Sequence, residues 1–287
     1  MRVRPAPRFP PPPAHRVPGA VRAVLCWLPG TVACGLLLAC AAGIDPAVPD
    51  ARSGEGWAYA PTVVAGRRSL MPAAAVPTRR GSTAFRAARP RIVPREAWLT
   101  PNAPTPPPAR YANRVEALFV HHTDSPNRYD CADAPRIIRA LHAGQAGARK
   151  WDDIGYNFLV DRCGTLYEGR AGGTERPVVG AHTQGFNHRS AGVAAIGTFT
   201  AGTPVPKAMT DAIAALAAWK LGLSGIDPRG AALLVSSNNL SRFPTGTAAV
   251  LPTVAAHKDG YHTHCPGAAL TAELPAIREA AARLQHR

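Results

Sequence analysis

Histidine and cysteine side chains gather in one short segment near the end of the chain, His257-Lys-Asp-Gly-Tyr-His-Thr-His-Cys265. It holds three histidines and one cysteine in nine residues, directly after the apolar run at residues 250–256. Zn²⁺ accepts imidazole nitrogen and thiolate sulfur together, and a catalytic zinc takes three protein ligands and keeps a fourth position for water. The segment supplies His257 and Cys265, so a third ligand must come from elsewhere in the chain.

The third ligand that we expect is His121, which ends an apolar run in Leu118-Phe-Val-His-His-Thr123. A lone histidine after such a run is more often a packed residue than a ligand, but the two partners favour a ligand here. Two further histidines, His262 and His264, flank Thr263. Either of them could contact the metal, so the ligand set stays open at this point.

The elements that must position these residues follow from hydrophobic periodicity. A nearly continuous apolar run predicts a central strand at residues 115–121, and Asp133 is a candidate cap for the helix that follows it. Other strands are expected at 156–160, 165–168, 178–182 and 193–199, and helices at 133–147, 207–223 and 271–285. Leu274, Ile277 and Leu284 would face inward on the last helix. Interleaved strands and helices indicate an α/β fold with a mixed central β-sheet covered by about three α-helices.

The proline and arginine content divides the chain into three regions. We expect a signal peptide at residues 1–42, a disordered Pro/Ala/Arg-rich linker at 43–89, and one domain at 90–287 with Trp98 as an early anchor. The formal net charge is +15; residues 1–89 hold 12 arginines against 3 acidic residues, or +9, which leaves +6 for the remainder. Most of the basicity lies outside the domain, so we expect no nucleic-acid partner.

The N-terminal region predicts an exported protein. Five arginines precede an apolar run at residues 23–42 that ends in small residues, as in a secretory signal. Leu37-Leu-Ala-Cys40 is similar to a bacterial lipobox, which would place a lipid anchor on Cys40 and tie the protein to a membrane. Ordinary cleavage near Ala41 is the alternative.

Five short motifs in one order closely resemble the peptidoglycan recognition protein family, whose catalytic members are zinc-dependent type 2 N-acetylmuramoyl-L-alanine amidases. The resemblance runs from about residue 91 to residue 284 and is strongest to the secreted actinobacterial branch. The motifs are Val120-His-His-Thr123, Asp153-Ile-Gly-Tyr-Asn-Phe158, Tyr167-Glu-Gly-Arg170, Gly180-Ala-His-Thr183 and His257-Lys-Asp…Thr263-His-Cys-Pro-Gly267.

The resemblance implies roles for the residues at the matching positions. His121, His257 and Cys265 would bind zinc, while Tyr156 and Thr263 would assist catalysis. The reaction implied is hydrolysis of the amide bond between the lactyl group of N-acetylmuramic acid and L-alanine of the stem peptide. Lys258 stands where arginine is commoner in the family, which is a mild departure.

Substrate contacts are implied less specifically, because each candidate also has an ordinary packing or surface role. The substrate would be peptidoglycan or a muropeptide, and we expect a monomer. The candidates for contacting it are His122, Trp151, Arg170, His182 and Asn187.

Two other classes of function stay open. One is a non-catalytic peptidoglycan-binding recognition module; the non-catalytic members of the family that this chain resembles lack the cysteine ligand, so Cys265 and Tyr156 favour the enzyme. A cysteine hydrolase would use Cys265 as the nucleophile with a histidine base, and would need no metal.

Once Cys265 is assigned to zinc, Cys131 and Cys163 remain in the domain; in an exported protein we expect a disulfide between them, with two unpaired thiols as the alternative.

Overall fold

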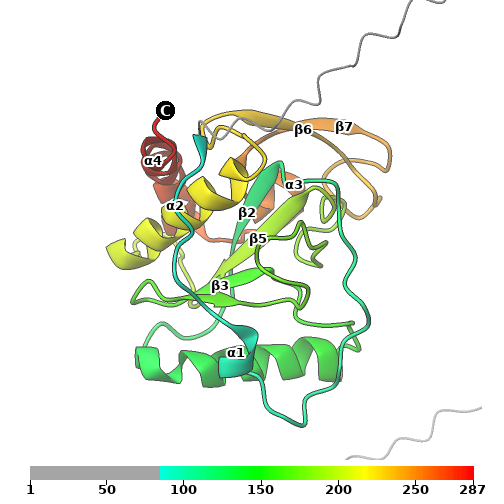
Figure 1. Ribbon diagram of the computed structural model, residues 1–287, viewed down its shortest axis with the longest axis vertical. Coiled ribbons are helices and arrows are strands. Elements are labelled where there is room, and N and C mark those ends of the chain that lie inside the picture. Colours follow the sequence, from blue (N-terminus) through cyan, green and yellow to red (C-terminus); the bar gives the residue numbers. More distant parts are fainter. Residues whose placement is uncertain (1–84) are drawn as a thin grey trace, which may run out of the picture. The chain divides into compact units, whose positions relative to one another are not determined.

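A six-stranded, mainly parallel sheet forms the centre of the domain in this computed structural model, which describes residues 85–287. The strand order is β1-β4-β3-β5-β2-β8, and only the β3–β4 pair is antiparallel (Figure 1). The predicted signal peptide, Cys40 and nearly all of the predicted linker lie outside the described residues. The strands are β1 (Ile92–Val93), β2 (Ala117–His122), β3 (Phe158–Val160), β4 (Leu166–Glu168), β5 (Ser190–Ala195) and β8 (Val254–Ala256).

Apart from His121, His122 and Ser190 at their ends, the central strands are apolar, because helices or a hairpin cover both faces of the sheet. Leu118 and Val120 of β2 pack into one cluster with the long helices α2 (Lys207–Gly222) and α4 (Ala268–Leu284). Phe119, which points the other way, packs against the hairpin of β6 (Ala231–Val235) and β7 (Ala248–Pro252). The alternation of side chains along one strand thus supplies two separate parts of the core.

Helix α1 (Ala134–His142) covers the face opposite α2 at the β3 end of the sheet (Figure 1). It continues as a π-helical segment, η4 (Ala143–Ala148), and is preceded by a 3₁₀ turn, η3 (Cys131–Asp133). Trp98 is fully buried beside it and donates a hydrogen bond to the carbonyl of Glu168, as expected for an anchor. Trp98 follows a second 3₁₀ turn, η2 (Arg95–Ala97), and the short helix α3 (His257–Gly260) follows β8.

The α/β fold with a mixed sheet and three long helices is confirmed, but three local predictions are wrong. Asp133 makes no capping hydrogen bond; Asp130 instead accepts one from the backbone N–H of Ala132. Residues 178–182 form no strand beyond a single bridge from Tyr111 to Val178, because their backbone groups bond to loops, as Ala181 N–H does to the Gly155 carbonyl.

The third correction concerns the last helix, where Leu274 and Ile277 are buried but Leu284 is 47% exposed. Leu284 is the final residue of α4, so the helix reaches past the edge of the core there. Strand boundaries also shift by a few residues: the strand expected at 193–199 runs from Ser190 to Ala195.

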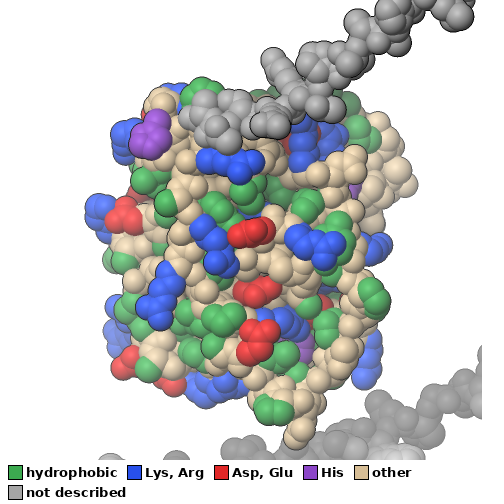
Figure 2. Space-filling model, in the orientation of Figure 1, with side chains coloured by type: hydrophobic (Ala, Val, Ile, Leu, Met, Phe, Trp, Pro, Cys, Tyr) green, Lys and Arg blue, Asp and Glu red, His purple; other side chains and the backbone are tan. Residues whose placement is uncertain are grey.

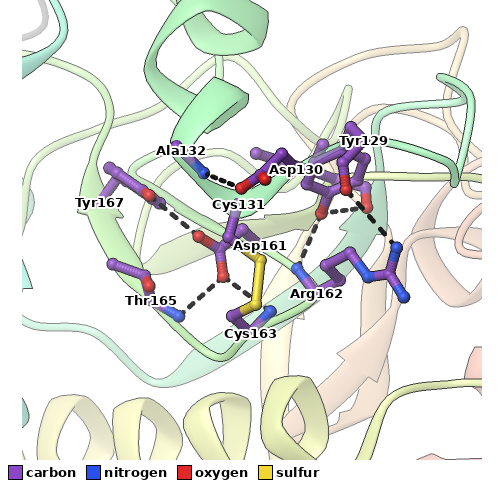
Figure 3. Close-up of a disulfide and its surroundings, with 10 residues drawn as sticks. Tyr129, Asp130, Cys131, Ala132, Asp161, Arg162, Cys163, Thr165 and Tyr167 are labelled. Atoms are coloured by element: carbon purple, nitrogen blue, oxygen red, sulfur yellow. Dashed lines mark hydrogen bonds between the residues drawn. A yellow bond between two sulfur atoms is a disulfide. The ribbon is translucent and has the colours of Figure 1, made fainter. Parts of the chain in front are cut away.

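The disulfide between Cys131 and Cys163 is present and joins η3 to the turn between β3 and β4 (Figure 3). Asp161 organises that turn: its carboxylate accepts hydrogen bonds from the backbone N–H groups of Cys163 and Thr165 and from the Tyr167 hydroxyl. The cross-link therefore ends on a turn that is already ordered by one buried carboxylate.

The surface of the described part mixes both signs of charge. Over the face seen in Figure 2, basic and acidic side chains are interspersed with apolar ones. Among the described helices, none is both long and apolar enough to cross a membrane.

Candidate metal centre and cavity

The ends of two neighbouring parallel strands bring the first two predicted ligands together. β2 pairs with β8 so that Val120 lies opposite Ala256, and the residue that follows each of them in the chain is a histidine, His121 in β2 and His257 at the start of the next helix. Parallel strands end at the same edge of a sheet, so both imidazoles reach one place. Their ring centroids are 4.3 Å apart.

The chain then turns back to deliver the third predicted ligand. The backbone N–H of Lys258, in the short helix α3, donates to the carbonyl of Cys265, which closes the loop between them. Gly267 follows with a positive φ of 92°, and a Cβ there would lie 2.1 Å from the carbonyl oxygen of Phe199. Only glycine fits this approach, which fixes where the Cys265 turn enters α4.

The three side chains fit one tetrahedral metal ion. The donor atoms of His121, His257 and Cys265 all lie within 4.8 Å of one another, and Cys265 Sγ is 3.9 Å from His121 Nδ1. Zinc bonds of the usual length at a tetrahedral angle would place a sulfur and a nitrogen about 3.6 Å apart. His262 and His264 are exposed and are not part of this group.

The electrostatics of the group also suit a cation. Burial, together with the neighbouring His257, His182 and His122, lowers the pKa of His121 well below its usual value. Burial and His122 lower the pKa of His257 to about 4, so both imidazoles are neutral at pH 7 and free to coordinate.

Burial raises the pKa of the Cys265 thiol to about 12, although a hydrogen bond from the His122 backbone N–H opposes this. Such a thiol stays protonated at neutral pH without a cation beside it, and a bound metal would supply that charge. The same raised pKa makes Cys265 a poor nucleophile, which weighs against the cysteine-hydrolase alternative.

A cavity of about 480 Å³ lies beside the ligand set. Tyr156 and His257 are part of its wall, and the Tyr156 ring centroid is 5.2 Å from that of His121. Three of the residues predicted to contact substrate also line it: Trp151, His182 and Asn187. Five other lining residues had not been predicted to contact substrate: Gln145, Arg149, Ala181, Gln184 and Tyr261.

Two predicted substrate residues do not line this cavity. Arg170 donates to the carbonyl of Ile154 and lies 3.6 Å from Asp152, so its guanidinium is engaged by other groups of the protein. His122 is half-buried and meets the site through its backbone N–H, which donates to Cys265 Sγ. Thr263 lies close to the cysteine, and its hydroxyl accepts a hydrogen bond from the backbone N–H of Cys265.

The missed residues had a weak signal in the sequence. Gln145 and Arg149 lie on or just after the π-helical segment η4, where a helical pattern with 3.6 residues per turn does not say which side chains face the sheet edge. Gln184 and Tyr261 lie next to or inside segments that the sequence had already singled out, so proximity to those motifs was the available clue.

The fold is thus a mainly parallel α/β sheet, and two histidines and a cysteine that could hold a metal ion lie at its edge beside a cavity. Comparison with known protein families then assigns the chain to one of them. The chain belongs to the type 2 N-acetylmuramoyl-L-alanine amidase family, which includes the peptidoglycan recognition proteins; the family model for N-acetylmuramoyl-L-alanine amidase (Amidase_2) matches residues 111–268. The predicted resemblance is thus confirmed.

Individual relatives agree with this assignment. The chain is 36% identical over 118 residues to peptidoglycan-recognition protein LE of Drosophila melanogaster, covering 41% of this chain and 33% of the relative. It is 40% identical over 121 residues to a Mus musculus N-acetylmuramoyl-L-alanine amidase, covering 40% of this chain and 21% of the relative. It therefore spans only a third and about a fifth of these two proteins.

Among solved structures, wild-type Drosophila PGRP-LB is similar to this fold. The TM-score is 0.50 with 26% sequence identity, over 65% of this chain and 93% of that one.

Proposed function

We propose that this protein is a zinc-dependent cell-wall amidase, which hydrolyses the amide bond between the lactyl group of N-acetylmuramic acid and L-alanine of the stem peptide. The observation that carries the proposal is the convergence of His121, His257 and Cys265 beside a cavity whose wall includes Tyr156. Membership of the amidase family supports it. The N-terminal sequence adds the inference that the protein is exported.

Zinc is the metal that fits the donor set best, because it accepts imidazole and thiolate together in tetrahedral geometry. His121, His257 and Cys265 would hold it beside the cavity. When bound, zinc supplies Lewis acidity, which polarises a carbonyl and makes a water nucleophilic near neutral pH. An amide needs this help, since its carbonyl is a poor electrophile and its amine a poor leaving group.

Tyr156 is the side chain placed to donate to the oxygen on which negative charge develops. Its phenol is half-buried in the cavity wall, with its ring centroid 5.2 Å from that of His121. Burial and the neighbouring Cys265 raise the pKa of Tyr156 above its usual value, so the hydroxyl keeps its proton. One such donor is typically worth about 3 kcal/mol of transition-state stabilisation.

Thr263 has a narrower role in this proposal. Its oxygen holds the Cys265 backbone N–H at 3.2 Å, which leaves the hydroxyl proton free to orient water or the reacting group. Trp151, Gln145 and Arg149 would then form the wall against which the muropeptide binds.

The bond that is cut can be identified with muramyl-pentapeptide and mass spectrometry of the products. The wild-type protein should release free pentapeptide, release should stop with chelator, and Zn²⁺ should restore it. Tyr156→Phe should lower kcat by about 10²- to 10³-fold with unchanged zinc content. Cleavage within the peptide would contradict the proposed bond, and bound but uncut ligand at full zinc occupancy would indicate a recognition module instead.

A further inference from the structure

His182 lies against the metal centre without being one of its ligands. Its Nδ1 is 3.2 Å from Nε2 of His121 and 3.0 Å from the Thr183 hydroxyl. Its other nitrogen, Nε2, is buried and has no hydrogen-bond partner within the described part of the chain. The ring thus makes all of its polar contacts through one atom.

The position of this ring is fixed by close packing. A Cβ at residue 192 would lie 2.4 Å from Cγ of His182, so the ring occupies the space that the glycine leaves open on β5. The backbone N–H groups of His182 and Thr183 both donate to Oδ1 of Asn187, at 2.8 Å each. The ring is therefore held at its distance from His121 by groups on both sides.

The two nitrogens of His121 have separate neighbours. Nδ1 faces the sulfur of Cys265, whereas Nε2 faces His182 and, at 3.4 Å, the Thr183 hydroxyl. If Nδ1 is the nitrogen that binds the ion, the neutral ring must carry its proton on Nε2. Two atoms lie within reach of that proton, and His182 Nδ1, at 3.2 Å, is nearer than the Thr183 hydroxyl oxygen.

We propose that His182 is a positioning residue for the metal: its Nδ1 accepts the Nε2–H of His121 and so holds His121 in the tautomer whose Nδ1 is free for the ion. The inference rests on the metal site of the proposed function, but not on the reaction.

The pairing also fixes the tautomer of His182. A proton on its Nδ1 would face the proton on His121 Nε2 across 3.2 Å, so the pairing places the proton of His182 on Nε2, the buried nitrogen for which the described residues offer no acceptor. A residue that orients a metal-binding histidine in this way typically changes metal affinity by about 10- to 100-fold when it is lost.

The test compares two substitutions that keep opposite properties of the ring. His182→Asn places an amide oxygen near the position of Nδ1 but loses ring volume. His182→Phe keeps the ring volume over Gly192 but has no acceptor. Zn²⁺ affinity of the full chain is measured by competition with a chromophoric chelator, and the unfolding midpoint of each variant is measured in parallel.

We expect His182→Phe to weaken Zn²⁺ binding by about 10- to 100-fold and His182→Asn to weaken it by less than about threefold. A role in packing alone predicts the opposite order, with Phe tolerated better than Asn, and that order would overturn the inference. Equal affinity in the wild type and His182→Phe would overturn it as well.

Thr183→Val supplies the matched control, because it removes the second acceptor near His121 Nε2 with little change in shape. Its affinity for Zn²⁺ should stay close to that of the wild type; a loss larger than that of His182→Phe would assign the role to Thr183 instead.

In the Zn²⁺-loaded protein, ¹⁵N spectra should show a pyridine-type Nδ1 and a pyrrole-type Nε2 for His182, and the reverse pattern would contradict the pairing. A protein that binds Zn²⁺ in this way but cuts no muropeptide would refute the proposed function alone.

Discussion

At the scale of single residues, the site depends on contacts that leave little space. His182 lies against Gly192 on one side, while its Nδ1 lies 3.2 Å from His121. His121 in turn faces Cys265 through its other nitrogen. A change of one methyl group next to this chain of contacts should therefore reach the metal ligands.

Gly192→Ala is expected to lower the free energy of unfolding by about 1–3 kcal/mol, because the new Cβ would overlap the His182 ring. Displacement of that ring should also weaken Zn²⁺ binding. Chemical denaturation and a chelator competition assay would measure the two effects. Gly144→Ala is the matched control, since a Cβ at that position meets nothing within 4 Å. Equal unfolding free energies for the two variants would show that the space beside His182 is not restricted.

The ligand residues show what could be predicted at this scale. His121 and His257 follow apolar runs, and the ends of such strands lie at a sheet edge, so their meeting was predictable from the sequence. The position of Arg170 was not, because its guanidinium is directed by the carbonyl of Ile154 and by Asp152, which only the folded loop brings near. Side-chain direction in a loop depends on tertiary contacts that no local pattern encodes.

At the scale of elements, the disulfide between Cys131 and Cys163 connects two segments on the α1 side of the sheet (Figure 3). It closes a loop with a sequence separation of 32 residues that contains α1, η4 and β3. The loop also holds Gln145, Trp151 and Tyr156, which line the cavity. The cross-link thus joins the two ends of the segment that supplies this wall, and it restricts the conformations of that segment in the unfolded chain.

Replacing both cysteines by serine should lower the free energy of unfolding by about 2–4 kcal/mol, mainly because the unfolded chain gains freedom. Denaturation curves of the wild type with and without reductant would measure this change. Reductant should shift the wild type by a similar amount and leave the Cys131→Ser/Cys163→Ser variant unmoved. A wild-type curve that reductant does not change would contradict a stabilising role for the bond.

Long periodic elements were predictable, whereas short irregular ones were not. The inward face of α2, including Met209, Ile213 and Leu216, matches the expected pattern because a regular helix repeats its apolar side. The stretch around Gly180 was predicted as a strand and is a loop, since its backbone bonds to Gly155 and Arg110 rather than to a neighbouring strand. A few apolar residues in a row do not distinguish the two.

At the scale of the described domain, one buried carboxylate connects the starts of the two central strands. Glu116 precedes β2 and Arg189 precedes β5; their side chains form an ion pair, and Arg114 also bonds the same carboxylate. Burial alone would raise the pKa of Glu116, but hydrogen bonds and charges from Arg189 and Arg114 outweigh it and lower the pKa below its usual value.

This lowered pKa predicts how stability depends on acid. The unfolded state, with a glutamate pKa near about 4.3, takes up the proton first as the pH falls. The stabilisation from Glu116 is therefore complete above about pH 5 and is lost as the pH falls through the lower pKa of the folded state. Glu116→Gln should be less stable than the wild type at neutral pH, and its stability should decline less steeply in acid.

Denaturation midpoints measured from pH 7 down to pH 3 would test this prediction. Arg189→Gln removes the partner instead of the acid and should flatten the same part of the curve. Parallel curves for all three proteins would show that the ion pair does not contribute to acid stability.

The central claim is that His121, His257 and Cys265 hold one zinc ion on which hydrolysis of the muramyl amide depends. The most direct measurement is a titration of the chelator-treated protein with Zn²⁺, following bound metal and release of stem peptide from muramyl-pentapeptide together. The account predicts that activity rises in proportion to occupancy and levels off at one zinc per chain, and that Cys265→Ser shows neither tight binding nor activity. Full activity in the metal-free protein, or in Cys265→Ser without bound zinc, would contradict it.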